Sequence, residues 1–442
     1  MILIKNGLLI DPANDLEGAF DLLIEDGVVK DIQPPNSFEG VQVQQTINAE
    51  NMWVVPGLID LHVHLREPGY EEKETILSGS QAAALGGFTS VCCMPNTKPA
   101  NHNSEITQYI LGKAKEANLV RVLPVGAVSI DLKGEVLAPL QELKEAGCVA
   151  FSDDGMPIYN AALMREALVW ASANDAVICC HEEDKELCGK GCMNESELSN
   201  AMDMPGRPKV AEEVMIARDI ELARVTGAKI HICHISTARA VDLVRRAKND
   251  GVKITTEVAA HHLLLSENAI SEHGTAAKMN PPLREEEDCS ALLAALKDGT
   301  IDALASDHAP HEKAVKDIEL QKAAPGLIGL QSSLPHYLSF VRDGKLSRSK
   351  AIAAMTSGPA RVFSLEQGTL SKGSPADVTI ISPDQRWTYT AERIASLSKN
   401  TPFLGDIMQG VAHTVLVNGE IIVENQKLKT QKLENNIENK VQ

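Results

Sequence analysis

Two histidines separated by one residue, His62 and His64 in "DLHVHLRE", are the first residues of this chain whose spacing could do chemistry. Alternate residues of a β-strand point to the same face, so a strand here directs both imidazoles to one side. Two imidazoles at a strand end can bind one metal ion. Taken alone, the motif leaves a chance pair as the alternative.

Further potential ligands stand where later apolar runs end. They are Asp153 and Asp154 in "CVAFSDDGMP", His181 in "DAVICCH", His231 and His234 in "HICHIS", and Asp307, His308 and His311 in "LASDHAPH". Neutral imidazoles combined with carboxylates suit zinc or another borderline divalent ion. The residue types therefore predict a metal centre, provided that the chain brings these run ends together.

The two histidines of "HICHIS" lie three residues apart, so they face opposite sides of an extended strand. His234 is nearer the end of the run and precedes Ser236 and Thr237, which can cap a following helix. We expect His234 to be the ligand and His231 to pack. For the pair His261-His262, a half-buried structural role competes with a supporting role at the site.

The adjacent acids Asp153 and Asp154 allow two interpretations. Asp-Gly followed by Pro is typical of an exposed turn. Alternatively, the apolar residues before them form a buried strand that ends in a working carboxylate. Adjacent strand residues point to opposite faces, so only one of the two acids can then face the site.

The elements that must position these residues form a regular series. Over residues 53–345, eight short apolar strands each precede an amphipathic helix, with the strands expected at 53–65, 88–95, 120–128, 148–154, 175–181, 228–236, 252–258 and 301–307. Eight such units predict an α/β fold, a (β/α)8 TIM-like barrel, with a doubly wound open sheet as the alternative. In a barrel, the carboxyl ends of all strands meet at one rim, which would bring the candidate ligands together.

Both chain ends have a different pattern. Residues 1–54 and 362–428 alternate apolar and polar residues between Asn-Gly and Asp-Gly turns, which indicates short paired strands. We expect them to form one small β-sandwich domain beside a barrel of residues 55–361. The polar tail, 429–442, is expected to be frayed.

Composition limits the possible partners. The formal charge of -18 over 442 residues argues against nucleic acid, and no apolar run reaches the roughly 18 residues of a membrane span. The N-terminus has no signal-peptide pattern. Nine cysteines without a C-x-x-C pair fit buried free thiols in a reducing cytoplasm, so we expect a cytoplasmic protein.

Several motifs together resemble those of the class I bacterial dihydroorotases, a branch of the cyclic amidohydrolases. The resemblance runs over nearly the whole chain, and its specific pieces are "GLIDLHVHLREPG", "GGFTSVCCMPNTKPA", "AGCVAFSDDG", "HICHIST", "MNPPLR" and "ASDHAPH". It implies one or two Zn²⁺ ions, held by His62, His64, Asp154, His181, His234 and Asp307. It further implies that Arg66, Asn96 and His311 hold a substrate carboxylate and that Asn280 contacts the substrate ring.

The reaction that this resemblance implies is reversible hydrolysis of (S)-dihydroorotate to N-carbamoyl-L-aspartate in pyrimidine biosynthesis. A metal lowers the pKa of a bound water, and the resulting hydroxide attacks the cyclic amide. Asp307 takes the water proton and passes it to the departing nitrogen. The segment 308–329, which carries His311, is expected to close over the substrate.

Two alternatives remain. Hydantoinases, dihydropyrimidinases and allantoinases share the barrel but usually place a carboxylated lysine at the end of strand four, where this chain has Asp153-Asp154. A non-catalytic scaffold for aspartate carbamoyltransferase would lose metal ligands, which this chain keeps. The partners that we expect are the small-molecule substrate, a second copy in a homodimer, and possible association with that transferase.

Overall fold

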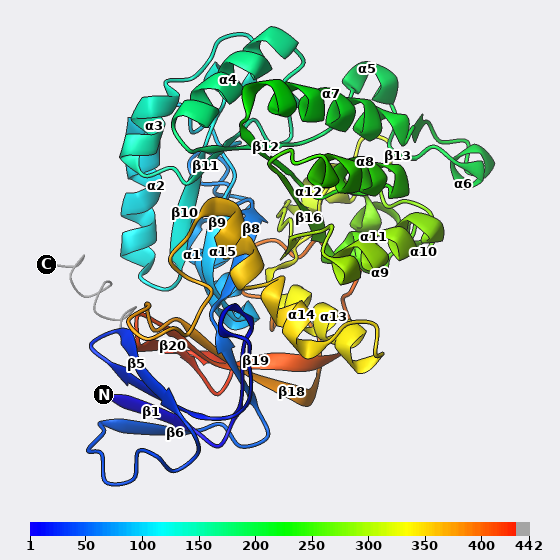
Figure 1. Cartoon of the computed structure of the whole chain (residues 1–442). Helices are drawn as coiled ribbons and strands as arrows, with labels where there is room; N and C mark the ends of the chain where they lie inside the picture. The colour runs from blue at the N-terminus through cyan, green and yellow to red at the C-terminus, as the bar shows by residue number, and fades with distance from the viewer. Residues whose placement is uncertain (430–442) are drawn as a thin grey trace, which may run out of the picture.

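An eight-stranded parallel barrel forms the centre of the computed structural model, which describes residues 1–429 (Figure 1). The strands pair in the order β17-β16-β15-β12-β11-β10-β9-β8, each beside its neighbour in sequence. Their bounds are β8 Leu58–Val63, β9 Phe88–Cys93, β10 Arg121–Gly126, β11 Ala150–Ser152, β12 Val177–Cys180, β15 Lys229–Ile232, β16 Ile254–Ala259 and β17 Ala303–Ala305.

The barrel is nearly closed. A parallel bridge between Val63 and His308 joins the region after β17 to β8, and the His64 amide donates to the His308 carbonyl at 2.8 Å. This sequential order excludes the doubly wound sheet, whose strand order reverses at a switch point. The barrel prediction is therefore confirmed.

Eight helices cover the outside of the barrel. They are α1 Ile76–Gly86, α2 Ser104–Ala117, α3 Leu140–Ala146, α4 Ala161–Ala173, α7 Val210–Thr226, α8 Ala238–Asn249, α11 Glu286–Asp298 and α13 Leu330–Arg342. Shorter helices lie in the loops and after α13: α5 Lys185–Cys188, α6 Glu197–Ala201, α9 Ala260–Leu264, α10 Ala269–His273, α12 Lys313–Lys316, α14 Arg348–Ala353 and α15 Ser357–Phe363. Two short strands, β13 Met193–Asn194 and β14 Gly206–Arg207, pair in the loop after β12.

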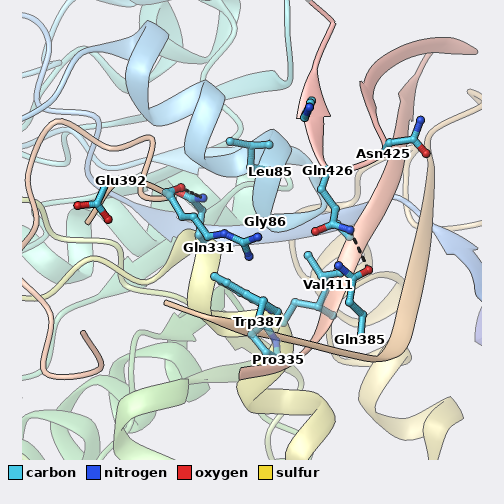
Figure 2. A pocket seen from close by; sticks show the side chains of 14 residues that line it. Leu85, Gly86, Gln331, Pro335, Gln385, Trp387, Glu392, Val411, Asn425 and Gln426 are labelled. Atoms are coloured by element: carbon cyan, nitrogen blue, oxygen red, sulfur yellow. Dashed lines mark hydrogen bonds between the residues drawn. The ribbon is translucent and has the colours of Figure 1, made fainter. Parts of the chain in front are cut away.

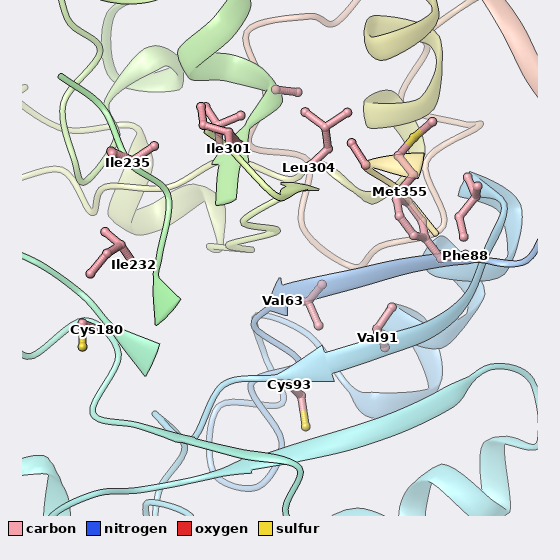
Figure 3. Close-up of a cluster of buried hydrophobic side chains, with 14 of the residues drawn as sticks. Val63, Phe88, Val91, Cys93, Cys180, Ile232, Ile235, Ile301, Leu304 and Met355 are labelled. Atoms are coloured by element: carbon pink, nitrogen blue, oxygen red, sulfur yellow. The ribbon is translucent and has the colours of Figure 1, made fainter. Parts of the chain in front are cut away.

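Both faces of each barrel strand are buried, which explains the nearly continuous apolar runs in the sequence. On β9, Val91 and Cys93 belong to the cluster packed between the strands and the helices, which Figure 3 shows with Val63 and Leu304. Cys92, between them, belongs to a second cluster with Ile59 and Cys233. All nine cysteines are free, and eight of them are buried, as expected for structural thiols.

Strands from both chain ends form two further sheets. One has the order β5-β4-β1-β6, and the other has the order β21-β20-β19-β18-β7-β2-β3. Their bounds are β1 Ile2–Lys5, β2 Leu8–Asp11, β3 Leu16–Ala19, β4 Asp21–Glu25, β5 Val28–Gln33, β6 Gln45–Asn48, β7 Trp53–Pro56, β18 Val378–Thr388, β19 Ile407–Val417, β20 Glu420–Glu424 and β21 Lys427–Leu428. The two sheets share one apolar cluster that includes Ile4, Leu9, Ile24, Val378 and Leu416.

The run "WVVPGLIDLHVHL", expected as one strand, is divided at Gly57. Residues before it form β7 of the end sheet, and residues after it form β8 of the barrel. A Cβ at Gly57 would lie 2.1 Å from Thr89 Oγ1, so this close approach requires glycine. The domain boundaries themselves stay a prediction, and the tail from residue 430 onward lies outside the described residues.

No helix within residues 1–429 has the length and apolar character needed to cross a membrane.

Candidate active site

Six candidate metal ligands, all of them buried, come from five strand ends at one rim of the barrel. They are His62 on β8, His64 just after it, Asp154 after β11, His181 after β12, His234 after β15 and Asp307 after β17. His62, His64 and Asp307 offer ligand atoms that all lie within 4.8 Å of one another, and so do Asp154, His181 and His234. His234 and Asp307 both have positive φ, at 32° and 45°, a strained backbone conformation that is often found at functional sites.

Asp154 joins the two groups. Its carboxylate oxygens lie 3.4 Å from His62 Nε2, 3.6 Å from His64 Nε2, 3.5 Å from His181 Nδ1 and 3.6 Å from His234 Nε2. These separations exceed those of good charge-assisted hydrogen bonds, so the atoms border a common space. One carboxylate facing four imidazoles is an arrangement suited to one cation or to two cations that share a ligand.

The donor set fits a divalent cation. His62 Nε2 and Asp154 Oδ1 are buried without a hydrogen-bond partner, and such orphaned polar atoms are costly unless something binds them. Burial acts to raise the pKa of Asp154, but the charge of His62 and bonds from His181 and His234 hold that pKa well below its ordinary value. A carboxylate that stays ionised among imidazole nitrogens offers the donor types that zinc takes.

Asp153, the other acid of the pair, is turned away from these imidazoles. Its Oδ1 accepts the amides of Val128 at 2.8 Å and Ser129 at 2.9 Å, and its Oδ2 bonds the Ser129 hydroxyl. It therefore ties the end of β11 to the loop after β10. Asp154 is the member of "SDDG" that faces the site.

Glu257 on β16 was not singled out from the sequence, although it fixes the orientation of His62. Its Oε1 accepts from His62 Nδ1 at 2.8 Å, both side chains are fully buried, and His62 Nε2 is thereby directed at Asp154 and Asp307. Burial would raise the pKa of Glu257, but bonds from His231 and His62 lower it to about 2. The sequence feature that could have indicated this role is an acidic residue inside "VKITTEV", a run expected to form a buried strand.

His231, expected to pack, also contacts Glu257. Its Nε2 lies 3.3 Å from Glu257 Oε2, and its Nδ1 lies 2.9 Å from Thr255 Oγ1. The carboxylate of Glu257 thus stands between two imidazoles, of which only His62 borders the candidate metal site. His261 is buried beside His262, with ring centroids 4.4 Å apart, and belongs to neither group of ligands.

Asn96 lies next to His64. Its Oδ1 accepts from His64 Nδ1 at 2.9 Å, and its Nδ2 donates to the Asp154 carbonyl at 3.3 Å. The amide oxygen of Asn96 thus sets the tautomer of a candidate ligand, and its expected contact with a substrate carboxylate stays a prediction.

Arg66 and His311 lie together on one side of the site. Arg66 Nη2 is 3.4 Å from His311 Nε2, and Arg66 Nε donates to the Pro310 carbonyl at 3.2 Å. Burial lowers the pKa of Arg66 to about 10, which leaves the guanidinium charged at neutral pH. His311 Nε2 donates to the Pro325 carbonyl at 3.0 Å.

Asn280 contacts His181. Its Nδ2 lies 3.2 Å from both His181 Nε2 and Glu183 Oε2, and its Oδ1 accepts from Arg207 Nη1 at 2.5 Å. Glu183 and Arg207 are 2.7 Å apart and were not predicted, since they stand in loops without periodicity. His308, by contrast, is held by Glu74 and the Gly329 amide, outside the cluster of ligands.

A cavity of about 640 Å³ lies elsewhere, between α1, α13 and the C-terminal strands (Figure 2). Gln331, Trp387 and Gln426 are among the residues that line it, and none of the predicted site residues does. The chemistry-bearing residues therefore do not belong to this cavity.

Comparisons with known proteins agree with the geometry. The Dihydro-orotase-like family model matches residues 52–240. A dihydroorotase of Trichlorobacter lovleyi is 47% identical over 424 residues, covering 95% of this chain and 99% of the relative. A dihydroorotase of Geotalea daltonii is 48% identical over 421 residues, with the same coverage of 95% and 99%.

Solved structures share the fold. L-Hydantoinase (dihydropyrimidinase) from Arthrobacter aurescens superposes with a TM-score of 0.87 at 26% identity, covering 97% of each chain. D-Hydantoinase (dihydropyrimidinase) from Thermus sp. reaches a TM-score of 0.83 at 26% identity, covering 98% of this chain and 97% of that one. The similarity to dihydroorotases extends over nearly the full length of the chain, and the buried histidine and aspartate clusters agree with it. The chain therefore belongs to the dihydroorotase family, whose members are metal-dependent cyclic amidohydrolases.

Proposed function

We propose that this enzyme interconverts (S)-dihydroorotate and N-carbamoyl-L-aspartate, and that the six residues His62, His64, Asp154, His181, His234 and Asp307 hold one or two zinc ions. The observation that carries the proposal is the Asp154 carboxylate facing four imidazoles, beside the charged guanidinium of Arg66 and its neighbour His311. A bound divalent ion supplies Lewis acidity, which polarises an amide carbonyl and acidifies water.

The residues of the chain supply the remaining functions. In hydrolysis, water adds to the ring amide, the C–N bond breaks, and the nitrogen leaves with a proton. Asp307, 3.3 Å from His64 Nε2, acts as the base that accepts the proton of water and returns it to this nitrogen. Ring closure follows the same path in reverse.

The substrate carboxylate is the feature that separates dihydroorotate from hydantoin and dihydrouracil. A guanidinium presents a planar pair of donors that matches a carboxylate, and Arg66 offers one at the edge of the candidate metal site. Asn96, with its amide group between His64 and Asp154, provides a second donor within reach of the same region. Asn280, whose Nδ2 lies 3.2 Å from His181 Nε2, contacts the ring amides in this proposal, because an amide side chain can both donate and accept.

Replacement of Arg66 tests this assignment. In Arg66→Ala, we expect kcat/KM for dihydroorotate to fall about 10- to 100-fold, the loss typical of a hydrogen bond to a charged group. Turnover of dihydrouracil, which has no carboxylate, should change little. Arg348→Ala is the matched control, since Arg348 forms an exposed pair with Glu17. An equal loss for both substrates in Arg66→Ala would contradict the assignment of the carboxylate site.

Turnover of each ring by the wild-type protein tests the alternative activities. The similar solved structures are hydantoinases, so faster turnover of hydantoin than of dihydroorotate would favour that class. A scaffold without activity would turn over neither ring. The homodimer and the association with aspartate carbamoyltransferase remain predictions.

A further inference from the structure

The connection between β18 and β19 reaches from the C-terminal sheet to the mouth of the barrel. Ile394 and Phe403, near its two ends, pack with Ile328 and Tyr389 in one buried cluster. Between them, the segment 396–400 bonds Glu74, which contacts His308, and it bonds Ala309 in the loop after β17. None of these residues was singled out from the sequence.

Asn400 is the centre of this contact. Only 9% of the residue is exposed, and its side chain uses every hydrogen-bonding group that an amide offers on the loop after β17. Its Oδ1 accepts from the His311 amide at 3.0 Å. Its Nδ2 donates to the carbonyls of Ala309 at 2.9 Å and Gly326 at 3.1 Å.

These bonds join the two ends of one loop. Ala309 and His311 stand where the loop leaves the barrel, and Gly326 stands where it returns. The Ile328 amide also donates to the Asn400 carbonyl at 2.9 Å. Space between the two ends is limited, because a Cβ at Gly326 would lie 2.8 Å from Ala309 Cβ and 3.2 Å from His311 Cδ2.

A second contact anchors the same segment next to Asp307. The Leu397 amide and the Ser396 hydroxyl bond the carboxylate of Glu74, which is fully buried. The same carboxylate lies 3.3 Å from His308 Nε2. The segment is thus held at His308 on one side and at His311 on the other.

We infer that Asn400 is a positioning residue for substrate binding, which fixes the backbone of His311 and so keeps the imidazole beside Arg66. This inference rests on the proposed function, in which His311 and Arg66 hold the substrate carboxylate. Within residues 1–429, the side chain of Asn400 forms hydrogen bonds with Ala309, His311 and Gly326, and with neither Arg66 nor any of the six candidate metal ligands. Its replacement should therefore weaken substrate binding while leaving the metal in place.

The test compares Asn400→Ala with Asp11→Ala. Asp11 is the matched control because it is buried and also bonds a distant backbone group, the Leu370 amide at 2.8 Å, but in the end sheets. We expect Asn400→Ala to raise KM for dihydroorotate about tenfold, to change kcat only a few-fold, and to keep the metal content of the wild-type protein. Asp11→Ala should leave KM at the wild-type value.

Trypsin cleavage supplies a readout that does not depend on activity. Lys313 and Lys322 lie in the loop that Asn400 closes, so Asn400→Ala should be cut there faster than both wild type and Asp11→Ala. Asn400→Asp keeps the acceptor for His311 but loses both donors, and it provides a nearly isosteric second variant should the alanine variant fail to fold. It should show the same two changes, with a smaller rise in KM.

The outcomes distinguish a failure of the proposed function from a failure of the inference about Asn400. If the wild-type protein does not turn over dihydroorotate, the proposed function fails, while cleavage of the loop still tests the role of Asn400. If turnover is normal but Asn400→Ala and Asn400→Asp match Asp11→Ala in KM and in cleavage, Asn400 only stabilises the fold and the inference is wrong.

Discussion

At the scale of single residues, three of the four candidate imidazoles have one nitrogen beside a polar neighbour and the other facing Asp154. Glu257 accepts from His62, Asn96 accepts from His64, and a Glu183 carboxylate oxygen lies 3.5 Å from His181 Nε2. Such partners fix the tautomer and orientation of a ligand before any metal binds. The chemistry proposed for this site therefore depends on residues that do not themselves bind the ion.

The two acids of "SDDG" provide the first test at this scale. Asp154→Ala should lose bound metal and activity, because the carboxylate that faces four imidazoles is removed. Asp153→Ala removes bonds to Val128 and Ser129, and it should lower stability while keeping most of the metal. Metal content and turnover of both purified variants check this pair. Greater metal loss in Asp153→Ala would reverse the assignment.

Glu257 provides the second test. Glu257→Gln keeps the shape but removes the charge that orients His62, and we expect metal affinity to fall about 10- to 100-fold. Competition with a chelator of known affinity measures the change. Glu183→Gln is a useful comparison, because Glu183 lies 3.5 Å from His181 Nε2 but also bonds Arg207. An unchanged metal affinity in Glu257→Gln would show that Glu257 does not support metal binding.

At the scale of elements, the sequence predicted those features of the fold that follow from a pattern of neighbouring residues. Eight apolar runs with polar ends predicted both the barrel and the rim on which the ligands meet, because parallel strands bring their carboxyl ends together. The division of 53–65 into β7 and β8 was not predictable from that pattern. It follows from the approach of Thr89 to Gly57, a contact between separate elements.

The residues that support the site were harder to predict for the same reason. Glu257 meets His62 from a strand 195 residues away, and Asn400 meets His311 from a segment 89 residues away. No spacing in the sequence records such pairs. Only the unusual acid in a buried strand gave a signal, and Asn400 gave none.

A buried histidine in helix α13, His336, is expected to make the stability of the protein depend on pH. His336 is buried against Phe403, with ring centroids 4.3 Å apart, and burial lowers its pKa from 6.5 to about 3. Below pH 6.5 the unfolded chain takes up a proton that the folded chain does not, so this histidine makes the free energy of unfolding decrease by up to about 1.4 kcal/mol per pH unit toward pH 3.

Denaturant unfolding of wild type and His336→Gln between pH 4 and pH 7, with chelator present, measures this effect. The variant should lose less stability than wild type as the pH falls. His273→Gln, at an exposed histidine, is the control and should follow wild type. Parallel curves for wild type and His336→Gln would show that His336 does not contribute to acid sensitivity.

At the scale of the whole molecule, the C-terminal region contacts the loop that borders the site. Strands from both ends build the sheets beneath the barrel in Figure 1, and the connection from β18 to β19 returns to the barrel mouth. The barrel supplies the candidate ligands, and the C-terminal segment holds the loop that carries His311. Loss of the end sheets should therefore affect substrate binding as well as stability.

The central claim is that metal held by these strand ends opens the ring of dihydroorotate. Its most direct test is turnover of dihydroorotate, hydantoin and dihydrouracil by one zinc-loaded sample, with bound metal measured in that sample. We predict that dihydroorotate is turned over much faster than the other two rings and that removal of metal abolishes this activity. Faster turnover of hydantoin or dihydrouracil, or no turnover of dihydroorotate by metal-loaded protein, would contradict the account.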